Sequence, residues 1–179
     1  MSTTSLPTSS AEADRPAIDV AGNRLRLFAE SPEMIAALTA DIRSAQRRVW
    51  IETYTIAADD TVAGLIEALK ERAAAGVECR LLYDSVGSIS TPTSFFDDLS
   101  QAGILVHGYH SLSSMFWQSE FFSRFNRRNH RKLAVIDDEI GYFGGMNLVD
   151  QSGPPILRND KVEPERTGRP WRDVHVRLV

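Results

Sequence analysis

The chain has 179 residues, of which 42% are hydrophobic and 25% are charged. This composition is that of an ordinary globular domain and excludes a fibrous or largely disordered protein. The formal net charge of -4 provides no general attraction to nucleic acid, whose binding domains tend to be basic. A nucleic-acid partner is therefore not expected.

Residues 1–22 are rich in Ser, Thr, Ala and Pro and lack the basic start and apolar core of a secretory signal, so we expect a disordered tail there. The domain is expected over residues 23–179. Cys79 is the single cysteine, so no intrachain disulfide can form, and its alternating surroundings predict a buried strand thiol. No stretch approaches the ~20 continuous apolar residues that span a bilayer.

Strand and helix patterns alternate through the first part of the chain. One helix is expected to start at Ser31-Pro32 and another at Asp59 or Asp60, because these residue types suit a cap or a first turn. Gly76 supplies the stop for the second of these helices. In chain order, the expected elements are a strand over 24–28, a helix from 31 to about 47, a strand over 49–56, a helix from 59 or 60 to 75, a strand over 77–83, a helix from 91 to about 103 and a strand over 104–107.

This alternation predicts an α/β fold, a layered α/β/α sandwich in which helices cover both faces of a mostly parallel central sheet. Residues 109–128 then form a long connection, and loops of that length are usually functional or mobile. Two further strands, over 133–136 and 140–143, are expected to form a hairpin. The hairpin returns residues 144–147 to the neighbourhood of residue 130.

A last strand is expected after an irregular excursion over residues 151–170, which is rich in Pro and Gly. From Trp171 the alternation resumes, with Asp173, His175 and Arg177 on one face. A carboxylate, an imidazole and a guanidinium therefore follow one another along that face.

The most informative segment runs from His130 to Asp137 and is followed by a Gly-Gly-Met-Asn sequence that ends at Asn147. Side chains alternate along a strand, so His130 and Lys132 share a face and Asp137 takes the other. A neutral imidazole can attack phosphorus, Lys132 can bind a non-bridging oxygen, and Asn147 can donate to the same phosphate after a tight glycine turn. The segment predicts a phosphodiester-handling site, in which Asp137 is better placed to hold the turn.

The spacing His-x-Lys-x4-Asp-x6-Gly-Gly-x-Asn resembles the HKD signature of the phospholipase D superfamily, with Gly145 where many members carry serine. The chain is also similar to the amino-terminal half of bacterial cardiolipin synthases, from about residue 24 to the end. The resemblance implies that the domain is one half of the phospholipase D fold, the first of two. The segments that carry it are 51–54, 75–84, 129–132 and 171–177.

The resemblance implies a two-step reaction, in which one histidine forms a phospho-histidine intermediate and a second protonates the leaving alcohol and then activates the acceptor. The chain has one such motif, because His107, His110 and His175 are not followed by Lys at the required spacing. Alone it is expected to be catalytically incomplete. The second half would come from a longer chain or from a homodimer, and the strand pattern of the last residues favours truncation.

The resemblance also places an acid near the catalytic histidine, at the position of Asp173. A carboxylate that accepts the second imidazole N–H would fix the tautomer, free the other nitrogen to attack and stabilise the positive charge that develops. The alternative is a surface-strand carboxylate paired with Arg172 or Arg177. The expected catalytic residues are His130, Lys132, Asp137 and Asp173.

Substrate phosphate is expected to contact Lys132 and Asn147. No metal or other cofactor is expected, because these groups and their equivalents in the partner half can offset the charge, and no clustered His/Cys spacing suggests zinc. Tyr54 and Asn129 match family-like stretches, but a satisfied buried hydroxyl and a strand-shaping amide explain them equally well. Both stay outside the expected catalytic set.

Two segments before the motif suit a membrane surface. From Arg124 to Lys132 five basic residues occur without an acidic one, and this positive rim would attract phosphate head groups or form a solvated loop. The aromatic cluster over residues 112–122 suits a membrane interface, or equally packs inside under a loop. By resemblance, the expected partner is a glycerophospholipid such as phosphatidylglycerol, met by a peripheral protein at the cytoplasmic, inner face of the cell membrane.

The leading interpretation is a phosphatidyltransferase of the cardiolipin synthase type, which passes a phosphatidyl group to an alcohol acceptor through phospho-His130. One alternative is a homodimeric endonuclease or phosphodiesterase of the same superfamily, against which the acidic net charge argues. Another is an inactive half-domain that binds anionic lipid without turnover. Solution mass measured beside transfer activity separates the three.

Overall fold

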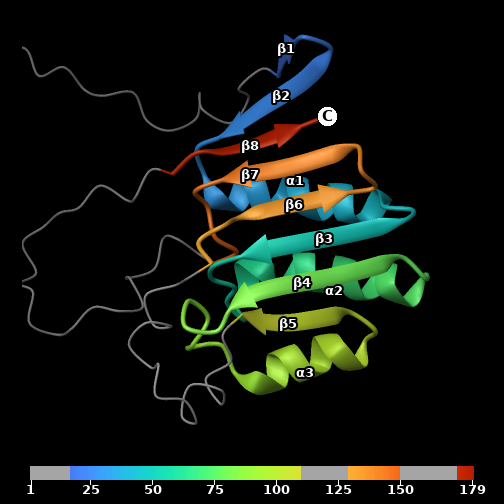
Figure 1. Ribbon diagram of the computed structural model, residues 1–179, viewed down its shortest axis with the longest axis vertical. Helices are drawn as coiled ribbons and strands as arrows, with labels where there is room; N and C mark the ends of the chain where they lie inside the picture. Colours follow the sequence, from blue (N-terminus) through green and yellow to red (C-terminus); the bar gives the residue numbers. More distant parts are fainter. Residues whose placement is uncertain (1–16, 110–128, 150–172) are drawn as a thin grey trace, which may run out of the picture.

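The computed structural model describes residues 17–109, 129–149 and 173–179. These residues form one open sheet of eight strands with three helices packed against it (Figure 1). The strand order is β1-β2-β8-β7-β6-β3-β4-β5, so the last three strands of the chain lie inside the sheet, between β2 and β3. This order makes neighbours of residues that are far apart in sequence.

In chain order, the elements are β1 (Ile18–Val20), β2 (Asn23–Phe28), α1 (Ser31–Ser44), β3 (Arg48–Thr53), α2 (Asp60–Ala74), β4 (Glu78–Asp84), α3 (Thr93–Gln101), β5 (Leu105–Tyr109), β6 (Leu133–Ile136), β7 (Ile140–Gly144) and β8 (His175–Leu178). All of the strands and helices expected from the sequence are present within a few residues. Strand β1 is additional. It lies within the residues expected as a tail, and its pairing with β2 makes it part of the sheet, while residues 1–16 lie outside the described residues.

Helix α2 shows how local sequence sets the limits of an element. The Asp59 carboxylate accepts a hydrogen bond from the Val62 N–H at 3.0 Å and so satisfies one of the free donors of the first turn. Gly76 follows the helix with a φ of 86°, a left-handed conformation that glycine adopts without strain. Both features are the ones expected from the sequence.

The sheet is mostly antiparallel, which corrects the predicted mostly parallel sheet. Strands β3, β4 and β5 are parallel to one another, but the other five pairings are antiparallel. The physical reason is the β6–β7 hairpin, whose turn residues Asp137 and Asp138 have φ values of 53° and 66° and reverse the chain. Strand β6 then joins β3 in the antiparallel sense, so this hairpin extends the sheet on the side opposite to β4.

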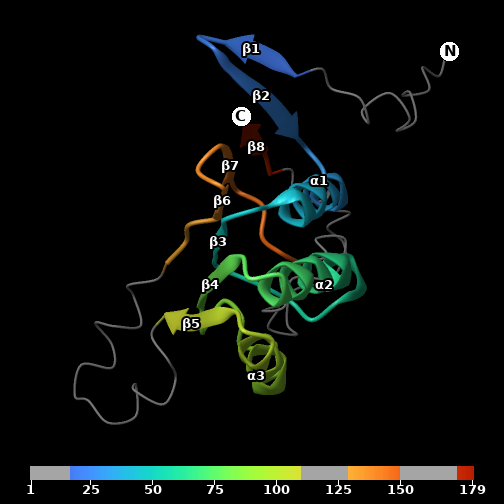
Figure 2. The ribbon, with the colours of Figure 1, turned by 90° about the vertical axis from the view of Figure 1, so that its right-hand side faces the viewer.

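The described helices α1, α2 and α3 lie on the same side of the sheet (Figure 2). Side chains that point to that side are buried, among them Ile51 on β3, Leu81 on β4 and Ile136 on β6. The helical layer expected on the other face is not present among the described residues. None of the helices in this part of the chain has the length and apolar character that crossing a membrane requires.

Strand β4 buries the single cysteine. Cys79 is 2% exposed, and its thiol donates to the Leu69 carbonyl oxygen of α2 at 3.7 Å. Burial raises the pKa of the thiol to about 11. The expected buried strand thiol is therefore confirmed, and it is protonated at neutral pH.

A partly buried polar network joins α1 to β7 and β8. The Tyr142 hydroxyl donates to the Asp41 carboxylate at 2.5 Å, and the Arg177 guanidinium donates to both oxygens of that carboxylate at 2.6 and 2.9 Å. Burial raises the pKa of Tyr142, and the hydrogen bond to Asp41 raises the pKa of Arg177. Arg177 therefore pairs with Asp41, not with Asp173, the partner considered from the sequence.

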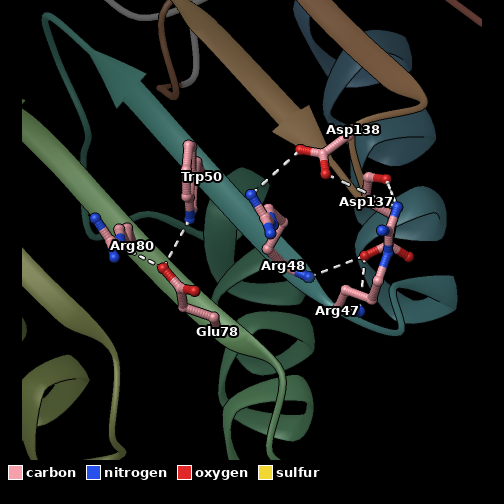
Figure 3. A network of polar contacts seen from close by, with 7 residues as sticks. All are labelled: Arg47, Arg48, Trp50, Glu78, Arg80, Asp137 and Asp138. Atoms are coloured by element: carbon pink, nitrogen blue, oxygen red, sulfur yellow. Dashed lines mark hydrogen bonds and ion pairs between the residues drawn. The ribbon is translucent and has the colours of Figure 1, made fainter.

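Asp137 fastens the β6–β7 turn to the start of β3 (Figure 3). Its carboxylate accepts hydrogen bonds from the backbone N–H groups of Gln46, Arg47 and Arg48 at 2.7 to 2.9 Å. Partial burial acts to raise the pKa of Asp137, but these hydrogen bonds and the Arg47 charge outweigh it and lower the pKa. Asp138 makes ion pairs with Arg47 and Arg48 at 3.8 and 3.5 Å.

We expect Asp137→Asn to destabilise the domain by about 1–2 kcal/mol at about pH 7, because one oxygen that accepts backbone N–H groups becomes an amide donor. Asparagine tolerates the left-handed backbone of the turn. Since the folded-state pKa of Asp137 is lowered, its contribution is complete above the unfolded-state pKa and is lost as the pH falls through the folded-state value. Urea unfolding at about pH 7 and about pH 3 measures both effects.

Asp138→Asn is the matched control for this substitution. It lies in the same turn with the same sign of φ, and its ion pairs are exposed, so its loss should stay below about 1 kcal/mol. Equal losses in the two variants at neutral pH would contradict the specific role of Asp137 in holding β3.

Candidate active site

All of the predicted site residues except Asp137 belong to segments that meet at one end of the central strands, where β3 and β4 end, β6 begins, β7 ends and β8 begins (Figure 1). The register of the strand pairs brings these segments together. Leu133 at the start of β6 pairs with Glu52 of β3 on one side and with Phe143 of β7 on the other. Gly144 then pairs with His175, the first residue of β8. The segments that precede or follow these residues are therefore neighbours in space.

His130 precedes β6 and is exposed, and its ring stacks on the Tyr54 ring with centroids 4.0 Å apart and an interplanar angle of 23°. The Lys132 ammonium lies 5.4 Å from the centroid of the same ring and donates to the His130 carbonyl oxygen at 2.9 Å. Tyr54 is thus a common contact of the imidazole and the ammonium, although it lies outside the set expected from the sequence. Tyr54 follows the last residue of β3 and lies on the same face as Glu52. This alternation is the sequence signal that could have identified Tyr54 as a site residue.

The charge of Asp173 acts on the Lys132 ammonium. Burial lowers the pKa of the half-buried Lys132 ammonium, and the Asp173 charge partly offsets this shift. Among the described residues no hydrogen bond joins Asp173 to His130. The expected orientation of the imidazole by Asp173 therefore stays a prediction, while the charge of this carboxylate favours the charged form of Lys132.

Two glycines allow β8 to approach the turn that follows β7. A side-chain Cβ at Gly144 would collide with the Val174 carbonyl oxygen, and one at Gly145 would collide with the Asp173 carboxylate. The Gly145 N–H donates to the Val174 carbonyl at 2.9 Å. Glycine at position 145 thus leaves the space that Asp173 occupies.

His175 is a buried neighbour of Lys132. It is 3% exposed, and it lines a small void together with Lys132, Glu52 and Thr53. Burial, together with the Lys132 charge, lowers the pKa of His175 to about 4, and its Nδ1 atom has no hydrogen-bond partner among the described residues. The imidazole is therefore neutral near pH 7. Its position next to Lys132 depends on the pairing of β7 with β8 and could not be read from sequence spacing.

Asn147 connects the segment after β7 to the segment after β3. Its Oδ1 atom accepts a hydrogen bond from the Thr55 N–H at 3.2 Å. The next residue, Leu148, donates its N–H to the Thr55 carbonyl at 3.1 Å and forms an isolated bridge with Ile56. Because the amide oxygen is engaged, the Nδ2 group is the part of Asn147 that can donate to a phosphate.

The structure separates Asp137 from the rest of the predicted set. It lies at the far end of β6 from Lys132, beside the start of β3 (Figure 3). Its contacts are those expected of a residue that holds the turn, and they involve none of the other predicted site residues. Within residues 17–109, 129–149 and 173–179 no group of three His, Cys, Asp or Glu side chains is arranged to hold a metal ion.

Some predicted features lie outside the described residues. Of the positive rim, Arg131 and Lys132 are described, while residues 124–128 are not. The aromatic cluster over 112–122 and the irregular excursion over 151–170 are also outside. The candidate active site is therefore defined by the segments that contain His130, Asn147 and Asp173.

Comparison with solved structures identifies the class of fold. NucT from Helicobacter pylori superimposes with a TM-score of 0.54 at 18% identity, over 87% of this chain and 84% of that protein. Nuc from Salmonella typhimurium, a phospholipase D family member, gives 0.53 at 16% identity over 87% and 82%. Phosphatidylserine synthase from Haemophilus influenzae gives 0.56 at 12% identity over 86% and 32%. Because the sequence identities are low, this structural similarity establishes the fold alone, which is that of the phospholipase D family.

Sequence comparison places the chain within this class. Residues 38–157 match the family described as "Cardiolipin synthase, PLD-like domain", and the chain belongs to that family. Cardiolipin synthase A from Pseudomonas fluorescens is 35% identical over 162 residues, which are 89% of this chain and 30% of that protein. The cardiolipin synthase from Oceanobacillus iheyensis is 35% identical over 91% of this chain and 31% of that protein. The chain thus spans less than a third of the length of these curated relatives.

We expect the free energy of unfolding to fall as the pH is lowered from about 6.5 to about 4, by up to about 3 kcal/mol from His175. The folded-state pKa of His175 is lowered, so in this window the unfolded chain binds a proton that the folded chain does not, and stability rises with pH. His175→Phe should flatten this part of the profile. Urea unfolding at several pH values measures the slope.

His107→Gln is the control for this experiment, because His107 lies exposed on β5. It should keep the wild-type slope. A slope that is unchanged in His175→Phe would contradict the burial of a neutral imidazole beside Lys132.

We expect Asp173→Asn to lower the pKa of Lys132 further, because this carboxylate is the charge that offsets the effect of burial. NMR titration of isotopically labelled dimethyl-lysine side chains measures the pKa. Glu139→Gln, in the turn at the other end of β6, should leave it unchanged. The electrostatic pairing is rejected if the Lys132 pKa is the same in Asp173→Asn and in the wild type.

Proposed function

We propose that the chain is the first half of a phosphatidyltransferase of the cardiolipin synthase type, with His130 as the nucleophile. The observation that supports this most is the exposed His130 ring stacked on Tyr54, beside the half-buried Lys132 ammonium. Membership of the family of cardiolipin synthase PLD-like domains supports the same assignment. The chain spans less than a third of the length of its curated relatives. The proposed activity therefore belongs to an assembly that contains both this chain and the second half.

The proposed reaction has two displacement steps at one phosphorus. A ring nitrogen of neutral His130 attacks, a P–N bond forms, and the P–O bond to the leaving alcohol breaks while a histidine of the second half supplies the proton. In the second step that histidine takes the proton of the acceptor hydroxyl. The acceptor oxygen forms a new P–O bond as the P–N bond breaks, and both histidines return to their starting states.

Lys132 and Asn147 are proposed to bind the non-bridging oxygens of the substrate phosphate. The Lys132 ammonium has three N–H donors, so it can bind phosphate and still contact the His130 carbonyl. Asn147 would donate through Nδ2, since its oxygen is held by Thr55. Both contacts gain strength as charge develops on the phosphate oxygens in the transition state.

The two carboxylates of the expected set are proposed to have different roles. Asp173 lies beside Lys132 and would keep it charged, and it would orient His130 once the second half is in place. Asp137 would act through the β6–β7 turn that it fastens to β3, without contact with substrate. Its presence in the motif then reflects the length of β6, which separates Lys132 from the turn.

The proposed partners are a glycerophospholipid, a membrane surface and a second half. Phosphatidylglycerol is the proposed donor, because the curated relatives are named cardiolipin synthases. Transfer of its phosphatidyl group to the free hydroxyl of a second phosphatidylglycerol would give cardiolipin and release glycerol. The protein would meet this lipid at the inner face of the cell membrane. The second half would be supplied by a longer chain or by a second copy.

We expect His130→Ala to reduce glycerol release from phosphatidylglycerol by at least about a thousandfold, because the attacking nitrogen is lost. Vesicles of phosphatidylglycerol are incubated with a preparation of determined mass that contains this half and its partner half, and glycerol and cardiolipin are quantified. His107→Ala removes an exposed imidazole on β5 and should keep the wild-type rate.

Undiminished turnover by His130→Ala would contradict the proposal. Cleavage of DNA or RNA phosphodiesters without lipid turnover would replace it with the endonuclease alternative. Binding of anionic vesicles without turnover by any assembly would support the alternative of an inactive half-domain.

A further inference from the structure

Two carboxylates from parallel strands converge on the residue that precedes His130. Glu52 pairs with Leu82 across β3 and β4, and Asp84 lies two residues beyond Leu82 on the same strand. The backbone N–H of Asn129 donates to Asp84 Oδ2 at 3.1 Å, and the Asn129 Nδ2 group donates to Glu52 Oε1. The parallel pairing of β3 and β4 thus brings both acceptors to one residue.

Both carboxylates are largely shielded from water. Asp84 is 0% exposed and the Glu52 side chain is 14% exposed, and a carboxylate removed from water is unfavourable unless its oxygens accept hydrogen bonds. Asp84 Oδ1 accepts from the Val86 and Gly87 N–H groups at 2.9 and 3.1 Å, and its Oδ2 accepts from Asn129. One buried carboxylate therefore holds both the loop after β4 and the residue before His130.

Asn129 is fixed at three points. Besides its two donated hydrogen bonds, its Oδ1 atom accepts from the Arg131 N–H at 3.3 Å. One planar peptide separates it from His130, so the direction in which the His130 side chain leaves the backbone follows from the placement of Asn129. The His130 carbonyl is held on the other side by Lys132. The imidazole itself is exposed and rests on the Tyr54 ring.

The same Asp84 carboxylate also supports Tyr54. A Cβ at Gly87 would collide with the Tyr54 carbonyl, so the loop capped by Asp84 packs closely against the backbone of Tyr54. The Ser88 hydroxyl donates to that carbonyl at 3.4 Å. Both members of the Tyr54–His130 stack are therefore held by groups that meet at Asp84.

We infer that Glu52 and Asp84 are positioning residues, which fix Asn129 and thereby direct the His130 imidazole onto Tyr54 and toward the substrate phosphorus. The inference rests on the proposed role of His130 as the nucleophile. Neither carboxylate touches the reacting atoms. Their effect on rate comes through geometry, because a displacement of about 1 Å in a reacting group can slow a reaction by on the order of a hundredfold.

Glu52 allows the sharpest test, because one of two uncharged replacements of similar size keeps an oxygen that can accept from Asn129 and the other does not. Glu52→Leu removes the acceptor for Asn129, and we expect kcat to fall about 10- to 100-fold with KM changed less than about threefold. Glu52→Gln keeps an oxygen that can accept, and should retain kcat within about threefold. Glu78→Leu is the matched control, since Glu78 is a carboxylate at the other end of β4 that contacts Trp50 and Arg80 (Figure 3). It should keep the wild-type kcat.

A second readout does not depend on turnover. Isotopic labelling of histidine makes the ring protons of His130 visible by NMR, and the ring current of the stacked Tyr54 should shift them upfield. The shift should disappear in Tyr54→Leu, which serves as the reference. It should be reduced in Glu52→Leu and preserved in Glu52→Gln and Glu78→Leu.

Asp84→Asn and a double-mutant cycle complete the test. Asparagine at position 84 can still accept from the loop but presents an amide donor to the Asn129 N–H, so it should reproduce the losses of Glu52→Leu. In an Asn129→Ala background, which lacks the Nδ2 donor, Glu52→Leu should change kcat by less than about threefold.

The outcomes separate this inference from the function on which it rests. If Glu52→Leu behaves like Glu78→Leu in both readouts, the positioning role is overturned. If Glu52→Leu lowers kcat and the ring shift is unchanged, the positioning role is also overturned. If the ring shift behaves as expected but His130→Ala remains active, the proposed nucleophile is wrong, while the placement of His130 by the two carboxylates stands.

Discussion

The candidate active site depends on the antiparallel pairing of β6 with β3, in which Leu133 lies opposite Glu52. This pairing sets the motif beside the end of the parallel strands. A slip of one residue would turn each side chain of β6 to the opposite face. Asp137 opposes such a slip, because it binds the backbone at the start of β3 while the motif lies at the other end of β6. The spacing between Lys132 and Asp137 is therefore the length of one short strand.

Among the described residues, the Lys132 ammonium is influenced by the Asp173 carboxylate and lies next to a buried histidine that is uncharged near pH 7. Lys132 is half-buried, which disfavours its charged form, and Asp173 counteracts this effect. His175 is buried next to Lys132 and stays neutral near pH 7. The two glycines at the end of β7 make this arrangement possible, because any side chain at Gly145 would occupy the place of Asp173. The site thus combines a half-buried ammonium with the exposed His130 imidazole.

Features that depend on local sequence could be predicted, and features that depend on strand pairing could not. The limits of α2, the β6–β7 hairpin and the burial of Cys79 follow from caps, turn residues and alternation. The direction of the sheet does not, because local alternation does not reveal that β6 returns to β3 in the antiparallel sense. Arg177 illustrates the same limit, since its partner Asp41 is 136 residues away and no spacing rule connects them. Tyr54 shares its strand face with Glu52, but its stacking on His130 depends on the same long-range pairing.

The proposed mechanism requires His130 to carry the covalent intermediate, so the residue that bears this bond should be mapped. The assembled enzyme is mixed with phosphatidylglycerol, quenched during turnover under conditions that preserve P–N bonds, digested and analysed by mass spectrometry. We expect a phosphatidyl group on the peptide that contains His130, attached to its imidazole. Attachment to another residue of this chain, or turnover without any adduct at His130, would contradict this mechanism.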